Sequence, residues 1–520
     1  MGDSPVNPRV LLRGGVVADG VGTTVQPADV LIEGPVITAV GHVEVPPGEC
    51  EVIGLVPGSV VCPGFIDAHA HAEGPLLASG RLEGALAQGV TTLVVGQDGQ
   101  SWIGANAATV QYLNRYFAPV NGALEPARDF GVADFARAVA GRLVQNVAVL
   151  ASQGTIRHNV AGMAAGPLTG AQRAAARREV EDALAAGAVG LSSGLDYLPS
   201  RFGAAGEVAE LARPLAGAGR PYVSHLRGYG PDVRAGLDEL AAVGAGAGVR
   251  VHASHLWGEP AGIQAALTVA DEAGVAVTFD MYCYRRSSTI LAQLLLPAEV
   301  QAGGPDRTLA ALTEPRHRAA LLAGAKLSEP YLRNVYLGAV PGDLAWAAGL
   351  SVAQAAARQA RPPGEWVLDL LVAADLGVGA HLDRPGLTGD QLAWICSHDR
   401  HCAGSDGIYQ GQHPHPRGYG AFARLAGHYL GAGPETGYQQ LARHLAANAA
   451  DVYGLRDRGR IAVGMAADLC VIGAAGPAAR STYGRPRELA TGVAHVFVNG
   501  VLVWPDSHLG AGKFPGRFVS

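Results

Sequence analysis

The sequence predicts an α/β protein: a (β/α)8 TIM barrel joined to a small β-sandwich that is built from both chain ends. Between about residues 60 and 450, apolar strand-like runs alternate with Ala-rich helical stretches, the pattern of a parallel α/β fold of barrel size. Short β-type runs separated by turns occupy both ends. We therefore predict a sandwich from 1–60 plus 455–520 and a barrel from 61–454.

The end segments show the spacing of a small antiparallel sheet. The expected strands are 10–12, 14–17, 28–32 and 36–40 near the N-terminus, and 467–472 and 493–503 near the C-terminus. In the central region the strand-like runs lie at 60–71, 89–95, 187–193, 221–225, 250–255 and 275–280, with a helix expected at 171–186. Prolines and a charged segment interrupt this rhythm, and they predict an insertion at about 290–350.

Composition narrows the class of protein. A hydrophobic content of 48% with 16% charged residues indicates a folded globular chain. The net charge of −6 offers no basic surface, so nucleic acid is not an expected partner. We find neither a signal-peptide pattern nor an apolar run long enough for a membrane span. The six scattered cysteines indicate reduced thiols in a cytoplasmic protein. The oligomeric state is left open.

Histidines and an aspartate follow the strand-like runs in an order that predicts a metal centre. His69 and His71 end the first run, and residues two apart on a strand point to the same side. His225 and His255 end two middle runs, and Asp406 follows a late one. Any one of them alone is explained by local structure, such as a turn at Asp406. Together they converge where barrel active sites lie, and zinc favours such nitrogen and carboxylate ligands.

Longer motifs surround these residues. They are PGFIDAHAH at 63–71, GVTT at 89–92, GLSSGLDY at 190–197, SHLR at 224–227, ASH at 253–255, GSDG at 404–407, HPHPR at 413–417 and GMAADL at 464–469. In these motifs the chain resembles, over nearly its whole length, the amidohydrolase superfamily and, within it, the N-acyl-D-amino-acid deacylase (D-aminoacylase) family.

The resemblance implies two metal positions, one bound by His69 and His71 with Asp406, and the other by His225 and His255. In D-aminoacylases a cysteine in an Asn-Cys-Gly turn bridges the two. Here that turn reads Gln97-Asp98-Gly99, so Asp98 takes the bridging position with a harder ligand than a thiolate. The alternative is that Asp98 is a turn residue and the centre holds one ion. The expected cofactor is therefore Zn²⁺, one ion or two.

Other amidohydrolases use a carboxylated lysine as the bridge. This chain has only two lysines, Lys326 and Lys513, and neither follows a predicted barrel strand. The ligands predict hydrolysis by a metal-activated water. Asp406 is the expected general base and then the general acid, because the departing nitrogen needs a proton.

For substrate binding, the resemblance implies that Arg417, Tyr282 and Ser288 hold the substrate carboxylate. The family lysine two residues after the second middle histidine is Trp257 here. Either Arg285 or Arg286 replaces its charge, or Trp257 stacks on a ring or apolar group of the substrate, or Trp257 is a packing residue. Tyr197 and Arg201 are expected at the rim of the site.

The sequence thus predicts a metal-dependent hydrolase that cleaves the amide of an N-acyl-D-amino acid or a related amide. The departures at Asp98 and Trp257 leave open an amidohydrolase that acts on a cyclic amide, a ureido compound or a specialised metabolite. A third possibility is a catalytically inactive barrel that serves as a binding protein. Retention of all five metal-ligand candidates argues against it.

Overall fold

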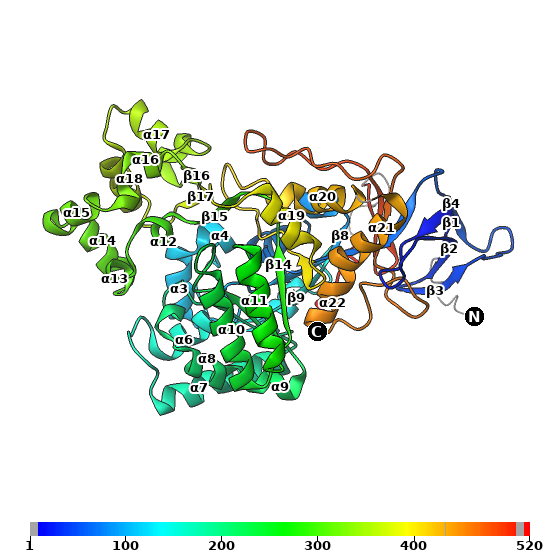
Figure 1. Ribbon diagram of the computed structural model, residues 1–520, viewed down its shortest axis with the longest axis horizontal. Coiled ribbons are helices and arrows are strands. Elements are labelled where there is room, and N and C mark those ends of the chain that lie inside the picture. The colour runs from blue at the N-terminus through cyan, green and yellow to red at the C-terminus, as the bar shows by residue number, and fades with distance from the viewer. Residues whose placement is uncertain (1–8, 432, 506–513) are drawn as a thin grey trace.

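The computed structural model describes residues 9–431, 433–505 and 514–520, and it has an α/β fold (Figure 1). A sheet that contains the N-terminal strands lies at one end of the molecule. Parallel strands with helices around them form the centre. A lobe made mainly of helices projects at the other end, drawn in green to yellow in Figure 1.

The sheet at the end of the molecule combines strands from both ends of the chain. Its order is β22-β21-β20-β5-β1-β2-β3, and β4 pairs with β1. The antiparallel register of β20 and β5 places Cys470 opposite Cys62. The strands are β1 (Arg9–Val17), β2 (Gln26–Glu33), β3 (Val36–Gly41), β4 (Glu51–Gly54), β5 (Val60–Pro63), β20 (Leu469–Ile472), β21 (Val493–Val498) and β22 (Val501–Trp504).

The central strands pair in parallel in three groups, with the orders β6-β8-β9, β10-β11-β12-β13-β14-β18 and β19-β7. Backbone hydrogen bonds connect the groups: Leu150 N donates to Val95 O at 2.9 Å, and Ala68 N donates to Ala403 O at 3.0 Å. The strands are β6 (Phe65–Asp67), β7 (Ala70–His71), β8 (Val90–Val95), β9 (Asn146–Val149), β10 (Ala151–Ser152), β11 (Leu191–Gly194), β12 (Tyr222–His225), β13 (Val251–Ala253), β14 (Val277–Met281), β18 (His401–Ala403) and β19 (Gly407–Ile408).

Helices follow most of these strands and bury apolar side chains. On α10, for example, Leu237, Leu240 and Val243 are buried at helical spacing. The helices are α1 (Glu73–Ser79), α2 (Glu83–Leu86), α3 (Ala107–Tyr116), α4 (Ala118–Asn121), α5 (Val132–Val139), α6 (Gln153–Ala161), α7 (Gly170–Ala185), α8 (Ala205–Ala212), α9 (Pro214–Ala218), α10 (Val233–Ala247), α11 (Pro260–Glu272), α19 (Gly389–Ser397), α20 (Arg417–Leu430), α21 (Pro434–Ala442) and α22 (Asn448–Tyr453).

The projecting lobe lies between β14 and β18 in the sequence. It has its own antiparallel sheet, in the order β15-β17-β16, and a core that includes Leu332, Leu337 and Trp366. Its elements are β15 (Arg286–Ile290), α12 (Leu291–Leu295), α13 (Ala298–Gln301), α14 (Pro305–Thr313), α15 (Pro315–Leu322), α16 (Glu329–Leu332), β16 (Val335–Ala339), α17 (Val352–Arg358), α18 (Pro363–Ala373) and β17 (Gly379–Asp383).

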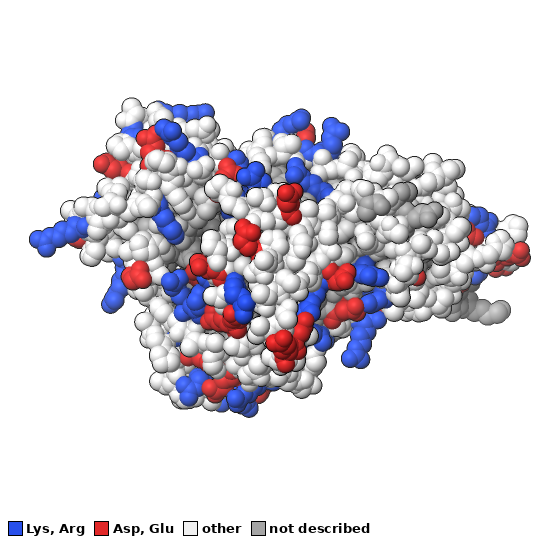
Figure 2. Space-filling view, in the orientation of Figure 1, with Lys and Arg blue, Asp and Glu red and all other residues white. Residues whose placement is uncertain are grey.

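Charged side chains of both signs are interspersed on the face drawn in Figure 2, and the end sheet is mostly uncharged there. None of the helices within the described ranges is long and apolar enough to cross a membrane. All six cysteines are free thiols.

Asp468, just before β20, ties the end sheet to the parallel strands. Its carboxylate accepts hydrogen bonds from Asn499 N at 2.7 Å and Asn146 Nδ2 at 2.9 Å, and it contacts Arg458. Its carbonyl accepts from Gly64 N. Asp468 thereby connects the segments that contain Gly64, Asn146 and Asn499. Asp468 and Arg458 are both buried, so this ion pair is shielded from water.

We expect Asp468→Asn to lower the free energy of unfolding by about 3–5 kcal/mol, because it leaves the Arg458 charge buried with an incomplete partner. Urea unfolding followed by circular dichroism measures this. The matched control is Asp457→Asn, because Asp457 pairs with the same arginine but its side chain is 65% exposed. That control should cost less than about 1 kcal/mol. Equal losses from the two variants would contradict the assignment.

Candidate metal centre and the cavity above it

Six candidate ligands lie at or just beyond the carboxyl ends of the parallel strands. His71 ends β7, and His225 ends β12. His69, Asp98, His255 and Asp406 each stand just outside a strand. The carboxyl ends of parallel strands share one edge of a sheet, which explains how residues so far apart in sequence meet.

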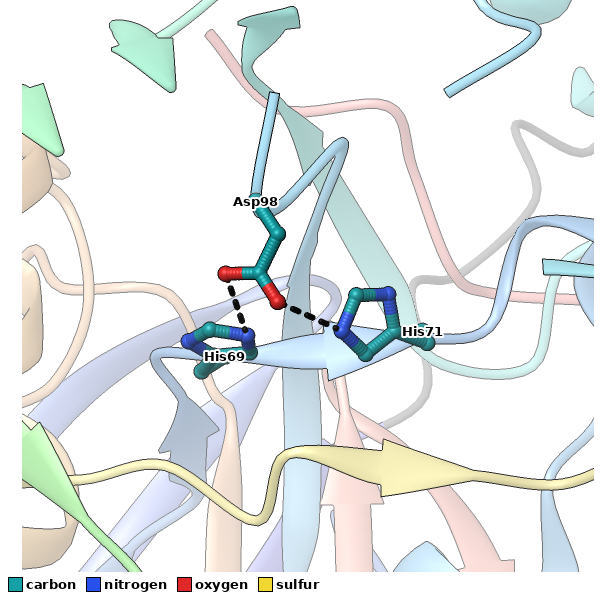
Figure 3. A group of neighbouring side chains, drawn as sticks. All are labelled: His69, His71 and Asp98. Carbon is teal, nitrogen blue, oxygen red and sulfur yellow. Dashed lines mark ion pairs between the residues drawn. The ribbon is translucent and has the colours of Figure 1, made fainter. Parts of the chain in front are cut away.

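Asp98 lies at the centre of the cluster. One carboxylate oxygen, Oδ1, is 3.6 Å from Nε2 of both His69 and His255. The other, Oδ2, is 3.6 Å from His71 Nε2 and 3.8 Å from His225 Nδ1. In Figure 3 the carboxylate points between the two histidines of the first pair. Asp98 therefore belongs to both groups of side chains that could hold a metal ion, one with His69 and His71 and the other with His225 and His255.

Asp406 faces the first histidine pair from the other side. Its Oδ1 is 3.4 Å from His71 Nε2 and 3.8 Å from His69 Nε2. Its backbone N donates to His69 O at 2.8 Å, and β19 pairs with β7 directly after it. The short β7–β19 pairing thus fixes the distance between this carboxylate and the His69–His71 pair.

The donor set fits a bound cation. His69 Nε2 and Asp98 Oδ1 are buried and have no hydrogen-bond partner, an expensive arrangement unless a cation sits between them. Burial disfavours the charged form of His71, but Asp406 and Asp98 raise its pKa to about 10. The cluster therefore attracts positive charge, and imidazole nitrogens with carboxylate oxygens are the ligands that zinc prefers.

Further side chains orient the histidines from behind. Asp280 at the end of β14 lies 3.4 Å from His69 Nδ1 and accepts a hydrogen bond from His255 N at 2.9 Å. Asn121 Oδ1 lies 2.9 Å from His71 Nδ1. The contacts to His69 and His71 engage Nδ1, the ring nitrogen that faces away from the cluster, which leaves Nε2 of both rings directed into the site.

Three of the six candidate ligands adopt a left-handed backbone conformation. The φ angles are 55° at Asp98, 35° at His255 and 50° at Asp406, a region that non-glycine residues seldom occupy. Such conformations cost free energy and persist where the surrounding structure enforces them. Here they turn the chain sharply at the strand ends, so that the carboxylates and the imidazole face one point.

Arg417, the first residue of α20, is buried and holds Asp406. Its Nη1 lies 2.7 Å from Asp406 Oδ2, and its guanidinium packs on the Tyr282 ring at 4.6 Å. Burial raises the pKa of Asp406, but Arg417 and the histidines outweigh it and lower that pKa below its usual value. Asp406 is therefore ionised at neutral pH and available to accept a proton.

A cavity of about 480 Å³ opens above the cluster. Its wall contains Asp98, His225, His255 and Asp406. It also contains four of the five residues that the sequence predicts for substrate binding, namely Tyr197, Trp257, Tyr282 and Ser288. The lobe supplies part of the opposite wall, including Tyr331, Asn334 and Leu382. The wall of the cavity therefore comes from both the strand ends and the lobe.

A family model described as "Amidohydrolase family" matches residues 339–504. An N-acyl-D-glutamate deacylase of Alcaligenes xylosoxydans xylosoxydans is 32% identical over 98% of this chain and 96% of its own length. A D-aminoacylase of the same organism is 30% identical over 98% of this chain and 97% of its own. The chain belongs to the N-acyl-D-amino-acid deacylase family of amidohydrolases. The family predicted from the sequence motifs is thereby confirmed.

Solved structures agree with this assignment. This amidohydrolase superposes on N-acyl-D-glutamate deacylase from Bordetella bronchiseptica, solved with zinc and a phosphonate that mimics the tetrahedral intermediate, with a TM-score of 0.80. It matches a D-aminoacylase crystal structure with the same TM-score. In each comparison the sequences are 28% identical, and the alignment covers 98% of this chain and 99% of the other.

Arg384 is a cavity residue of this amidohydrolase that sequence reasoning missed. It follows β17, is only 8% exposed, and donates from Nη2 to Tyr282 Oη at 3.1 Å. Its guanidinium lies 5.1 Å from the centre of the Trp257 ring. The charge beside Trp257 therefore comes from a distant segment without a recognisable motif.

The other basic residues considered from the sequence have different surroundings. Arg286 pairs with Asp383 at 2.8 Å and lies between two tyrosine rings, and Arg285 is exposed. Arg201 pairs with Asp196, an aspartate of the cavity wall. Lys326 lies on the lobe at the cavity wall, far along the chain from any parallel strand end, and Lys513 lies outside the described residues.

We expect Asp98→Asn to weaken metal binding at least about tenfold, because an amide has no negative charge to share between two histidine pairs. Asparagine keeps the size of the side chain and tolerates the left-handed backbone, so the fold should persist. Competition with a chromophoric zinc chelator measures the affinity, and elemental analysis counts the ions. Asp196→Asn, a change at the cavity rim, is the control. Unchanged affinity and stoichiometry in Asp98→Asn would exclude a bridging role.

Proposed function

We propose that this protein is a zinc-dependent deacylase that hydrolyses the amide bond of N-acyl-D-amino acids. The observation that carries the proposal is the convergence of four histidines, Asp98 and Asp406. Both aspartates, His225 and His255 line a cavity whose wall also contains Arg384. The full-length family relationship, and the zinc and tetrahedral-intermediate mimic in the related B. bronchiseptica enzyme, support the reaction class.

We further infer that the parallel strands close into one (β/α)8 barrel and that the chain ends form a β-sandwich. Two hydrogen bonds support closure: Ala68, just after β6, donates to Ala403 in β18, and Leu150, between β9 and β10, donates to Val95 in β8. The first half of β1 pairs with β4 and the second half with β5, on the same side. A buried apolar cluster with members from both chain ends, including Leu12, Ile32, Leu469 and Phe497, lies within this sheet. The proposed limits of the sandwich and of the barrel are those predicted from the sequence, and the predicted insertion at about 290–350 lies within the lobe that runs from β15 to β17.

In the proposed site, His69 and His71 with Asp406 hold one zinc position, His225 and His255 hold the other, and Asp98 lies between them. Bound zinc supplies Lewis acidity, which acidifies a water molecule and polarises the amide carbonyl. Asp406 takes the proton from the attacking water and delivers it to the amide nitrogen, so that a neutral amine leaves. Arg417 keeps Asp406 ionised and directed into the site.

We propose that Arg384 and Tyr282 bind the substrate carboxylate. A guanidinium presents a planar pair of donors that matches a carboxylate. The Trp257 ring and the hydrogen bond to Tyr282 fix the position of Arg384 before substrate arrives. Ser288 and Tyr197 complete the wall. Binding of the substrate carboxylate by Arg417, which the family resemblance implies, stays a prediction. In the structure the Arg417 guanidinium contacts Asp406. The cytoplasmic location also stays a prediction.

We expect release of amine from N-acetyl-D-amino acids, and not from their L enantiomers, by zinc-loaded protein. Glutamate, aspartate and leucine derivatives cover the acidic and apolar side chains, and a chelator should abolish the reaction. His255→Ala should lose both zinc and activity. If zinc-loaded protein hydrolyses none of these compounds, the deacylase proposal is wrong. The same protein should then be assayed with cyclic amides and ureido compounds, and retained zinc without any turnover would favour a binding protein.

Arg384→Gln should lower kcat/KM for N-acetyl-D-leucine roughly 10- to 150-fold, mostly through KM, since a charged hydrogen bond is worth about 1.5–3 kcal/mol. N-acetyl-D-leucinamide, which has no carboxylate, separates binding from folding. The variant should hydrolyse N-acetyl-D-leucinamide as fast as the native enzyme does. The ratio of kcat/KM for N-acetyl-D-leucine to that for N-acetyl-D-leucinamide should therefore fall. Arg285→Gln is the control for the loss of a nearby, exposed charge. Equal loss on both substrates would contradict carboxylate binding.

A further inference from the structure

A second polar cavity, of about 700 Å³, lies at the opposite edge of the parallel strands from the metal ligands. Arg220 stands just before β12 and Arg250 just before β13, the two strands whose other ends lead to His225 and His255. The remaining wall comes from the segment around α22 and from residues 517–520, near the C mark in Figure 1. We call this space the arginine cavity. Its five arginines are Arg220, Arg250, Arg456, Arg458 and Arg517.

Four of the five arginines of this wall form no ion pair within the described ranges. Asp457 and Asp451 are the two carboxylate side chains of the wall. Asp457 is paired with Arg458, and Asp451 is paired with Arg460, outside the wall. Across the described ranges no carboxylate forms an ion pair with the other four wall arginines. A protein with a net charge of −6 therefore gathers four unpaired guanidinium groups around one space.

Two of these guanidinium groups are held in place before any ligand binds. Arg220 Nη1 donates to Tyr453 O at 2.6 Å, and Arg250 Nε donates to Val452 O at 3.1 Å. These are their only side-chain hydrogen bonds within the described part of the chain, so most of the donors of each group remain uncommitted. A Cβ placed on Gly454 would lie 3.2 Å from Arg220 Nη1 and 3.7 Å from Arg250 Nη2. Both groups therefore converge on Gly454, where the lack of a side chain leaves the space open.

The arginines also act on one another. Burial lowers the pKa of Arg220 and of Arg250, and the neighbouring charge of Arg456 lowers each further. Arg220 itself lowers the pKa of Arg250, and Asp451 opposes this only in part. Like charges this close repel, and an anion between them would remove the repulsion.

We propose that the arginine cavity binds a small phosphate-bearing anion, at a site separate from the catalytic cavity. Guanidinium groups bind phosphate oxygens in pairs of parallel hydrogen bonds, and two fixed and two exposed arginines supply enough donors for one or two phosphoryl groups. This site lies at the start of strands whose ends hold metal ligands. It needs neither the zinc centre nor the proposed substrate for its chemistry.

Isothermal titration calorimetry with inorganic phosphate and with pyrophosphate tests the proposal. The protein is the zinc-loaded enzyme freed of excess zinc, and sodium chloride keeps the ionic strength constant, because ionic screening weakens such binding. We expect saturable binding of at least one of the two anions by the native enzyme. Arg456→Gln combined with Arg517→Gln should weaken that binding at least about tenfold. Both residues are exposed and make no side-chain hydrogen bond within the described ranges, so this double variant should fold and keep its deacylase activity without phosphate.

The matched control combines Arg178→Gln with Arg213→Gln, which removes the same charge from exposed positions outside the cavity. It should bind phosphate as the native enzyme does. Equal affinity in all three proteins would overturn the proposal, because the anion would then occupy the zinc centre or no defined site. Absence of binding by the native enzyme at millimolar anion would overturn it as well. Neither result would bear on the deacylase reaction, which is assayed separately.

Discussion

The functional site depends on a concentration of imidazole and carboxylate groups that a bound cation would stabilise. Four imidazoles and two carboxylates meet in a small, largely buried volume, where unpaired nitrogens and oxygens cost free energy. Asp98 shares its two oxygens between both histidine pairs. Any change at this residue therefore alters both halves of the site at once. Other parts of the fold, from the β7–β19 pairing to Asp280 behind His69, keep these groups at their present distances.

The backbone contributes as much as the side chains. A strand delivers a side chain to one face or the other, and neither direction points straight along the strand axis. The left-handed residues at Asp98, His255 and Asp406 change that direction at the point where each strand ends. Their conformational cost is met by the packed structure below them. Three of the six candidate ligands thus lie where the regular strand conformation ends.

The candidate metal ligands could be named from the sequence because the histidines and Asp406 follow apolar runs typical of strands, and because the turn at Asp98 matches the bridging turn of the family. The family could be predicted for the same reason, since its motifs are the strand ends. Arg384 and Asn121 could not be assigned roles, because their positions depend on how distant segments pack and no local pattern marks them. Asp280 ends the strand-like run 275–280, but the sequence does not show which side chains its carboxylate faces. Arg417 illustrates another limit. A sequence shows that an arginine is near the site, but whether its guanidinium faces substrate or Asp406 is decided by three-dimensional packing.

The sheet that joins the two chain ends has a consequence for synthesis on the ribosome. Cys470 Sγ contacts Pro63 O across 407 residues of sequence, and β5 pairs with β20 along its whole length. While the chain is being made, β5 has an open edge on that side until β20 emerges. An open edge invites pairing with other chains. Strand β20, which is made late, therefore covers the open edge of β5, which is made early. A truncated chain that ends before β20 would leave this edge of β5 exposed.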